Sequence, residues 1–174
     1  MNGTPRIYVL DANVFVQAHR RHYAFEICPG FWDCLIHQHE AGRVISIDRI
    51  RVEISGGDKD ALEEWAKNTA PKTLFASTAV PAVTASYASM VAWVQAQPQF
   101  KREAKEEFAQ VADGWLVAFA RANDRHVIVT HEEFNADAKK RVPLPNVCKQ
   151  FGVEHIDTFA MLKELKARFH WRAP

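Results

Sequence analysis

The sequence predicts an α/β domain with three layers, in which a mainly parallel central sheet lies between helices. The first observation is a set of short apolar runs that are typical of strands buried on both faces, as in a parallel sheet. The second is that segments with helical spacing separate these runs, as the crossovers between parallel strands require. The runs are Ile7 to Leu10, Val44 to Ile47, His126 to Thr130 and Val153 to Ile156.

In the first half of the chain, a helix is expected directly after the first strand, which ends in Asp11-Ala12-Asn13. Asp48 is a candidate N-cap for a short helix after the second strand. Glycines or a Pro-Gly pair separate the other segments. The further helices expected here are 31–41, 49–54 and 60–68.

In the second half, Pro81 is placed to start a helix that runs to about Gln97. The strongly charged stretch 100–110 is expected to be helical, so the segment of about 81–110 is a candidate protruding element. Helices are also expected over 113–123, before Gly152, and over 157–165. Residues 1–174 are expected to form a single domain, since no linker or repeat divides them.

Composition is typical of a globular protein with a continuous core: 48% of the 174 residues are hydrophobic and 25% are charged. The formal net charge of +1 gives no overall attraction for polyanions, so a nucleic acid would need a local basic patch. Three small basic clusters are candidates, or are simply solvated faces. They are His19 to His22, Arg49 with Arg51, and Lys139 to Arg141.

The three cysteines are an odd number, and the start of the chain lacks the pattern of a signal peptide. No stretch approaches the roughly 18 apolar residues of a membrane span. A cytoplasmic protein without a membrane partner is therefore expected. Cys28, Cys34, His37 and His39 have zinc-type side chains, but the gap between the cysteines is wider than usual.

Carboxylates at strand ends are the first candidates for a site, because ligands of parallel sheets bind beyond the carboxyl ends of the strands. Asp11 follows the first strand, where a helix cap is the alternative role. Glu132 and Glu133 follow the strand that ends near Thr130, and solvated loop positions are their alternative.

Two further acids lie on helices. Asp113 shares a face with core residues at spacings of three, four and seven, where an unpaired carboxylate costs on the order of several kcal/mol. The helix dipole offsets only about 0.3–1 kcal/mol of this cost. Glu53 lies near the inward stripe of its short helix, and an ion pair with Arg49 is its alternative.

Four carboxylates in one pocket would repel one another, and a hard divalent cation such as Mg²⁺ or Mn²⁺ would remove this repulsion. Such a site suits phosphodiester hydrolysis, because the metal activates water and neutralises the leaving oxygen. A haloacid-dehalogenase phosphatase fits less well, since it needs a second acid where this chain has Asn13. A receiver domain also fits less well, since it needs an acidic pair beside its aspartate and a lysine on a later strand.

The segments IYVLDANVF, the Glu53 helix, ADGWLVAFA and HVIVTHE resemble the successive acidic motifs of PIN-domain ribonucleases. The ending PLPNVCKQFGVEHIDTFAMLKEL resembles the close of a PIN-like subgroup found among bacterial toxin–antitoxin (VapC-type) toxins. The resemblance covers nearly the whole chain and implies a PIN-like α/β/α fold.

The resemblance implies metal-binding roles for Asp11, Glu53 and Asp113, a supporting role for Asn13, and a strand-end hydroxyl at Thr130. Many members carry an aspartate at the position of Glu132, so the fourth metal ligand is open between Glu132 and Glu133.

The resemblance further implies an Mg²⁺- or Mn²⁺-dependent endoribonuclease that leaves a 5′-phosphate and a 3′-hydroxyl. Its implied partners are RNA, a cognate antitoxin protein and a second copy in a homodimer. The alternative is a PIN-like module that has lost catalysis and binds RNA or protein as a regulator.

Overall fold

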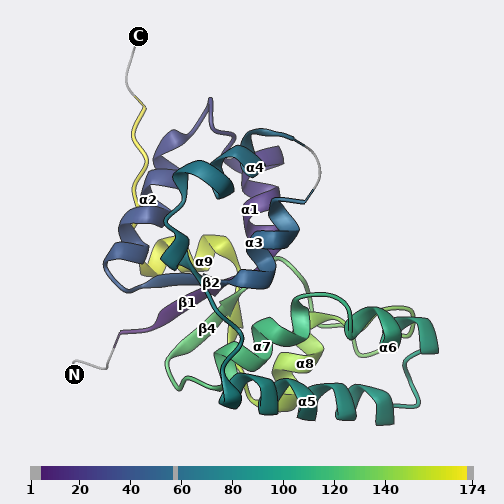
Figure 1. Ribbon diagram of the computed structural model, residues 1–174. Coiled ribbons are helices and arrows are strands. Elements are labelled where there is room, and N and C mark those ends of the chain that lie inside the picture. Colours follow the sequence, from purple (N-terminus) through teal and green to yellow (C-terminus); the bar gives the residue numbers. More distant parts are fainter. Residues whose placement is uncertain (1–4, 57–58, 172–174) are drawn as a thin grey trace.

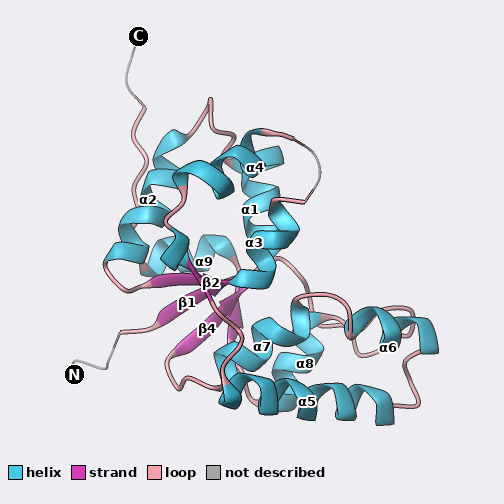
Figure 2. Cartoon of the chain, viewed as in Figure 1, coloured by secondary structure: helices cyan, strands magenta, loops and turns pink. Residues whose placement is uncertain are grey.

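The structure, a computed structural model, describes residues 5–56 and 59–171 and has three layers built on a five-stranded parallel sheet. Figure 1 shows one group of helices above the sheet and a second group below it. Figure 2 shows the strands together at the centre between these two layers. The predicted α/β fold with a mainly parallel sheet is confirmed.

The sheet has the strand order β3-β2-β1-β4-β5, so the chain begins in the middle and builds outward in both directions. All four sheet pairings are parallel, and Leu10 of β1 is the register partner of Val129 of β4. The strands are β1 (Ile7–Leu10), β2 (Val44–Ile47), β3 (Phe75–Ala76), β4 (His126–Val129) and β5 (His155–Ile156). Strand β3 was not predicted, and the predicted strand from Val153 to Ile156 is shorter in the structure, where β5 covers His155–Ile156.

One helical layer consists of α1 (Ala12–Gln17), α2 (Pro29–Glu40), α3 (Asp48–Ile54), α4 (Ala61–Glu64) and α9 (Thr158–Glu164). Short π-helical turns follow α1 and α4, at Ala18–His22 and Trp65–Thr69, and a 3₁₀ turn, Lys72–Leu74, precedes β3. Helix α3 begins at Asp48, not after it. Asp48 is therefore not the predicted N-cap, and its carboxylate accepts hydrogen bonds from Thr78 and from the backbone amide of Arg49.

The other layer consists of α5 (Pro81–Ala96), α6 (Arg102–Phe108), α7 (Asp113–Arg121) and α8 (Leu144–Phe151). Helix α5 packs along α7 and buries Met90 and Val94, while Ala104 and Phe108 of α6 are buried as well. The segment expected to protrude is thus packed into this layer, with α6 at the end farthest from the sheet in Figure 1.

A glycine makes the close approach of α5, α6 and α7 possible. A Cβ atom on Gly114 would lie 2.8 Å from Cζ of Phe108 and 2.9 Å from Cε2 of Tyr87. Because Gly114 is the second residue of α7, this packing fixes the start of the helix that carries Asp113.

Candidate metal and nuclease site

The carboxyl-terminal edge of the sheet brings two strand ends together. Asp11 follows β1 and Thr130 follows β4, and the two strands are neighbours in register. The backbone amide of Asp11 donates a hydrogen bond to the carbonyl of Val129 at 3.0 Å. Sequence reasoning placed both residues at strand ends, and the strand order makes them adjacent.

The Asp11 carboxylate is buried, with only 4% of the residue exposed. Its Oδ1 accepts from the backbone amide of Ala12 at 2.7 Å, and its Oδ2 accepts from the Thr130 hydroxyl at 2.8 Å. Asp11 is therefore the N-cap of α1 as well as a candidate site residue, so the two roles considered for it are compatible.

Asn13 and Thr130 form a support around Asp11. The Asn13 amide nitrogen donates to the Thr130 hydroxyl oxygen at 3.0 Å, and its amide oxygen accepts from the backbone amide of His131 at 3.0 Å. The backbone amide of Glu132 donates to the same hydroxyl at 3.1 Å. With two donors aimed at it, the Thr130 hydroxyl directs its own proton to Asp11, which fixes the carboxylate orientation.

Asp113 begins α7, and its side chain is 15% exposed. Burial, and next the charge of Asp113, raise the pKa of Asp11 to about 8. Burial, and next the charge of Glu132, raise the pKa of Asp113 to about 7, although Arg141 acts in the opposite direction. These acids, which are far apart in sequence, therefore share one desolvated region of negative charge.

Glu132 is held by contacts at both carboxylate oxygens, and its side chain is 14% exposed. Oε1 forms an ion pair with Arg141, and Oε2 accepts from the backbone amide of Leu144 at 3.0 Å. The second contact satisfies an amide at the start of α8. Arg141 also approaches Asp113, with 3.7 Å between Nη2 and Oδ2. A single guanidinium therefore bridges two of the acids.

Glu53 lies at the rim of this acid site. The residue is exposed, but partial desolvation raises its pKa, and Arg141 opposes the increase. Glu53, Asp113 and Arg141 line one cavity of about 210 Å³, together with Glu107 of α6, which the sequence did not suggest. The alternative partner of Glu53, Arg49, lies instead over the ring of Trp115.

A wider cavity of about 690 Å³ adjoins the first at Arg141. It is lined by His131, Glu132, Glu133, Lys139 and Lys140 among others. The predicted basic cluster 139–141 thus flanks the acids, whereas Glu133 is exposed. Of the two candidates for the fourth acid, Glu132 is the one whose charge acts on both Asp11 and Asp113.

The donor set suits a hard divalent cation, because it consists of carboxylate oxygens whose mutual repulsion a cation would relieve. Within residues 5–56 and 59–171, however, no three His, Cys, Asp or Glu side chains are arranged as a ready metal site. The guanidinium of Arg141, which is paired with Asp113 and Glu132, provides the countercharge in this arrangement.

Cys28, Cys34 and His37 line one cavity, but no three His, Cys, Asp or Glu side chains in the part of the chain that the structure describes are arranged to hold a metal ion. Burial, and next the charge of Asp11, raise the pKa of the Cys148 thiol, so it is a neutral thiol and not an activated nucleophile. Both ring nitrogens of His39 lie within hydrogen-bonding distance of oxygens, those of Val44 and Thr73. That ring is therefore already engaged and is a poor candidate for a zinc ligand.

Asn146 is a structural residue that the sequence did not reveal. It is buried in α8, accepts from the backbone amide of Asn135 at 3.0 Å and donates to the carbonyl of Asn135 at 2.7 Å. This pair of bonds fixes the loop that carries Glu132. Its only signal in the sequence is a polar residue in an otherwise apolar stretch, which is weak.

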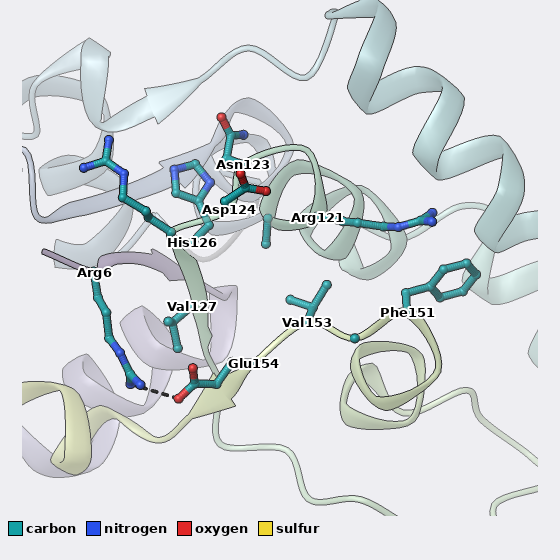
Figure 3. A pocket seen from close by; sticks show the side chains of 12 residues that line it. Arg6, Arg121, Asn123, Asp124, His126, Val127, Phe151, Val153 and Glu154 are labelled. Atoms are coloured by element: carbon teal, nitrogen blue, oxygen red, sulfur yellow. Dashed lines mark ion pairs between the residues drawn. The ribbon is translucent and has the colours of Figure 1, made fainter. Parts of the chain in front are cut away.

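A separate cavity of about 500 Å³ lies at the opposite edge of the sheet, near the start of β4 (Figure 3). Arg6 there pairs with Glu154 at 2.9 Å, and Arg121 extends toward the ring of Phe151.

Residues 8–169 match a family described as "Domain of unknown function (DUF4411)". The match covers most of the chain, which therefore belongs to this family. No curated protein matches the chain. Among the described residues, no helix combines the length and apolar character needed to cross a membrane.

Proposed function

We propose that this chain is an Mg²⁺- or Mn²⁺-dependent endoribonuclease of the PIN-domain type, which acts as the toxin of a toxin–antitoxin pair. One observation carries the catalytic part of the proposal: the contacts of Thr130 and Arg141 join the buried Asp11 with Asp113 and Glu132 into one site, because Thr130 bonds Asp11 and the Glu132 amide and Arg141 contacts Asp113 and Glu132. The toxin role, with its antitoxin partner and homodimer, rests on the resemblance of the sequence motifs alone.

Asp11, Asp113 and Glu132 are the residues that would hold the metal, with Glu53 at the rim. When bound, the metal would supply an activated water and neutralise charge on the phosphodiester. Thr130 and Asn13 keep the Asp11 carboxylate in one orientation, which limits the entropy lost on binding a ligand.

Arg141 contributes a second kind of interaction with the substrate. Its side chain is 57% exposed and lines both cavities beside the acids. A guanidinium in this position has N–H donors for a phosphate group, and Lys139 and Lys140 extend the basic surface. The acids and the cations thus lie side by side, so that one polyanionic substrate can contact both.

The second candidate function is a PIN-like regulatory module that binds RNA or protein without cleavage. The contacts of Glu132 favour it, because both carboxylate oxygens are engaged by Arg141 and by the start of α8. A fourth acid with only structural partners would leave the site with fewer metal ligands.

The deciding experiment compares wild-type protein with Asp11→Ala in Mn²⁺-dependent cleavage of structured and unstructured RNA. Asp33→Ala is the matched control, because Asp33 is an exposed acid on α2 that lines neither of the two cavities beside the acid site. We expect Asp11→Ala alone to abolish cleavage while its circular dichroism spectrum stays native. Cleavage that persists in Asp11→Ala, or wild-type protein that binds RNA without cutting it, would contradict the nuclease proposal.

A companion measurement separates Glu132 from Glu133. Mn²⁺ that binds only the native state raises thermal stability by mass action. We expect Glu132→Gln to reduce the Mn²⁺-induced increase in melting temperature and Glu133→Gln to leave it unchanged. The reverse result would assign the fourth ligand to Glu133.

A further inference from the structure

The side chain of Arg49 is held in a fixed position at the start of α3. Its guanidinium carbon lies 3.9 Å from the centre of the Trp115 ring, which is close for a cation–π contact. Its Nε donates to the Thr78 hydroxyl at 3.2 Å. Thr78 is fixed in turn by two hydrogen bonds to the Asp48 carboxylate. Little side-chain freedom is therefore left for a ligand to remove.

Trp115 is itself part of an aromatic stack. Its ring lies 3.8 Å from the ring of Tyr87, with an interplanar angle of 15°. The Tyr87 hydroxyl donates to the carbonyl of Ala109 at 3.0 Å, which anchors the far end of the stack. Tyr87, Trp115 and Arg49 thus form a column of three flat groups that ends in a cation.

Arg49, at the end of this column, lines a cavity. Arg49 is exposed and lines a cavity of about 480 Å³ together with Val52, Glu53 and Val111. Val52 is an apolar side chain with 72% exposure. Glu53 and Val111 also line the cavity that contains Asp113 and Arg141, so the two spaces adjoin. The column therefore ends beside the acid site.

We propose that Arg49 is a stacking platform for an unpaired base of the RNA, next to the nucleotides at the acid site; this inference rests on the proposed function. A planar guanidinium stacks on a base as it does on an aromatic ring, whereas a lysine ammonium does not. Since every base has a π face, the platform tolerates any sequence but requires an unstacked base. It selects single-stranded RNA.

Contact with a phosphate is the competing role for an exposed arginine, and the substitution Arg49→Lys separates the two. Lysine keeps the charge that a phosphate contact needs and loses the flat surface that stacking needs. Arg51→Lys is the matched control, because Arg51 belongs to the same helix but donates to the carbonyl of Ala66 and lies near Phe75.

The test measures binding of single-stranded oligonucleotides to the full-length protein in EDTA, with an abasic nucleotide placed at each position in turn. We expect Arg49→Lys to weaken binding of the intact oligonucleotide about 5- to 150-fold, as the loss of one stacked base does. At one position the abasic oligonucleotide should bind wild type and Arg49→Lys equally, since neither then has a stacked base. Arg51→Lys should bind every oligonucleotide as wild type does.

If binding in EDTA is too weak to measure, the same comparison is made in Mn²⁺, where Arg49→Lys should raise KM and leave kcat unchanged. An Arg49→Lys protein with wild-type affinity and KM would overturn the platform but leave the nuclease proposal intact. A penalty that is equal for intact oligonucleotides and every abasic one would also overturn it, in favour of a phosphate contact. Wild-type protein that neither binds nor cleaves RNA would overturn the proposed function itself.

Discussion

Replacement of Asp113 by asparagine is expected to stabilise the metal-free protein at pH 8 and to stabilise it less at pH 5. Burial, and next the charge of Glu132, raise the pKa of Asp113 from 3.8 to about 7. An acid whose pKa is raised by folding favours the folded state fully below its unfolded pKa, and this stability is lost as the pH rises through the folded pKa. At pH 8 the wild-type protein therefore has an unfavourable carboxylate that asparagine removes.

The size of the expected stabilisation follows from the unfolded and folded pKa values of Asp113. A rise of the pKa from 3.8 to about 7 corresponds to roughly 4 kcal/mol, at about 1.36 kcal/mol for each pKa unit. This is an upper bound, because Asp113 titrates together with Asp11 and Glu132. About half of it, roughly 2 kcal/mol, is expected in the single variant. For a protein of this size that is an increase of about 4–8 °C in melting temperature.

The assay is thermal denaturation in EDTA at pH 5 and pH 8, followed by circular dichroism, with Asp33→Asn as the exposed control. The difference between Asp113→Asn and wild type should be smaller at pH 5, which lies between the unfolded and folded pKa values of Asp113, and largest at pH 8. A variant that is less stable than wild type at pH 8, or a difference that does not depend on pH, would refute the shared site of negative charge.

Three further substitutions probe the surroundings of the site. Arg141→Met removes the cation beside Asp113 and Glu132, so we expect the free energy of unfolding to fall by about 1 kcal/mol at pH 8 and by less at pH 5. Calorimetry should also show that the variant binds Mn²⁺ more tightly than wild type does. Equal losses at both pH values would count against this electrostatic role. Asn146→Ala leaves both backbone groups of Asn135 without their partner and should lower the free energy of unfolding by about 2 kcal/mol. An unchanged midpoint of urea unfolding would disprove this role. Gly114→Ala places a methyl group against Phe108 and Tyr87 and should cost about 1–3 kcal/mol in urea unfolding; wild-type stability would show that α5 and α6 yield easily.

The sequence by itself determined the α/β class and most of the elements, because hydrophobic periodicity is a local property. The apolar runs before Asp11 and Thr130 became β1 and β4, and the stripe that includes Asp113 became α7. The same patterns placed Asp113 on an inward face, where its side chain is largely buried, whereas Glu53, predicted near the inward stripe of its helix, is exposed. Helix ends were less accurate: the predicted helix over 113–123 ends at Arg121.

Only the tertiary structure decided the contacts that join distant segments. Strand β3 exists because β2 lies beside it, and Asp48, at the start of its helix, is also bound to the distant Thr78. The loop between β4 and α8 brings Arg141 beside Asp113 and Glu132. The same loop places the Glu132 carboxylate where it accepts a hydrogen bond from the backbone amide at the start of α8. A charged side chain takes the partner that folding brings within reach, and no spacing along the chain encodes that distance.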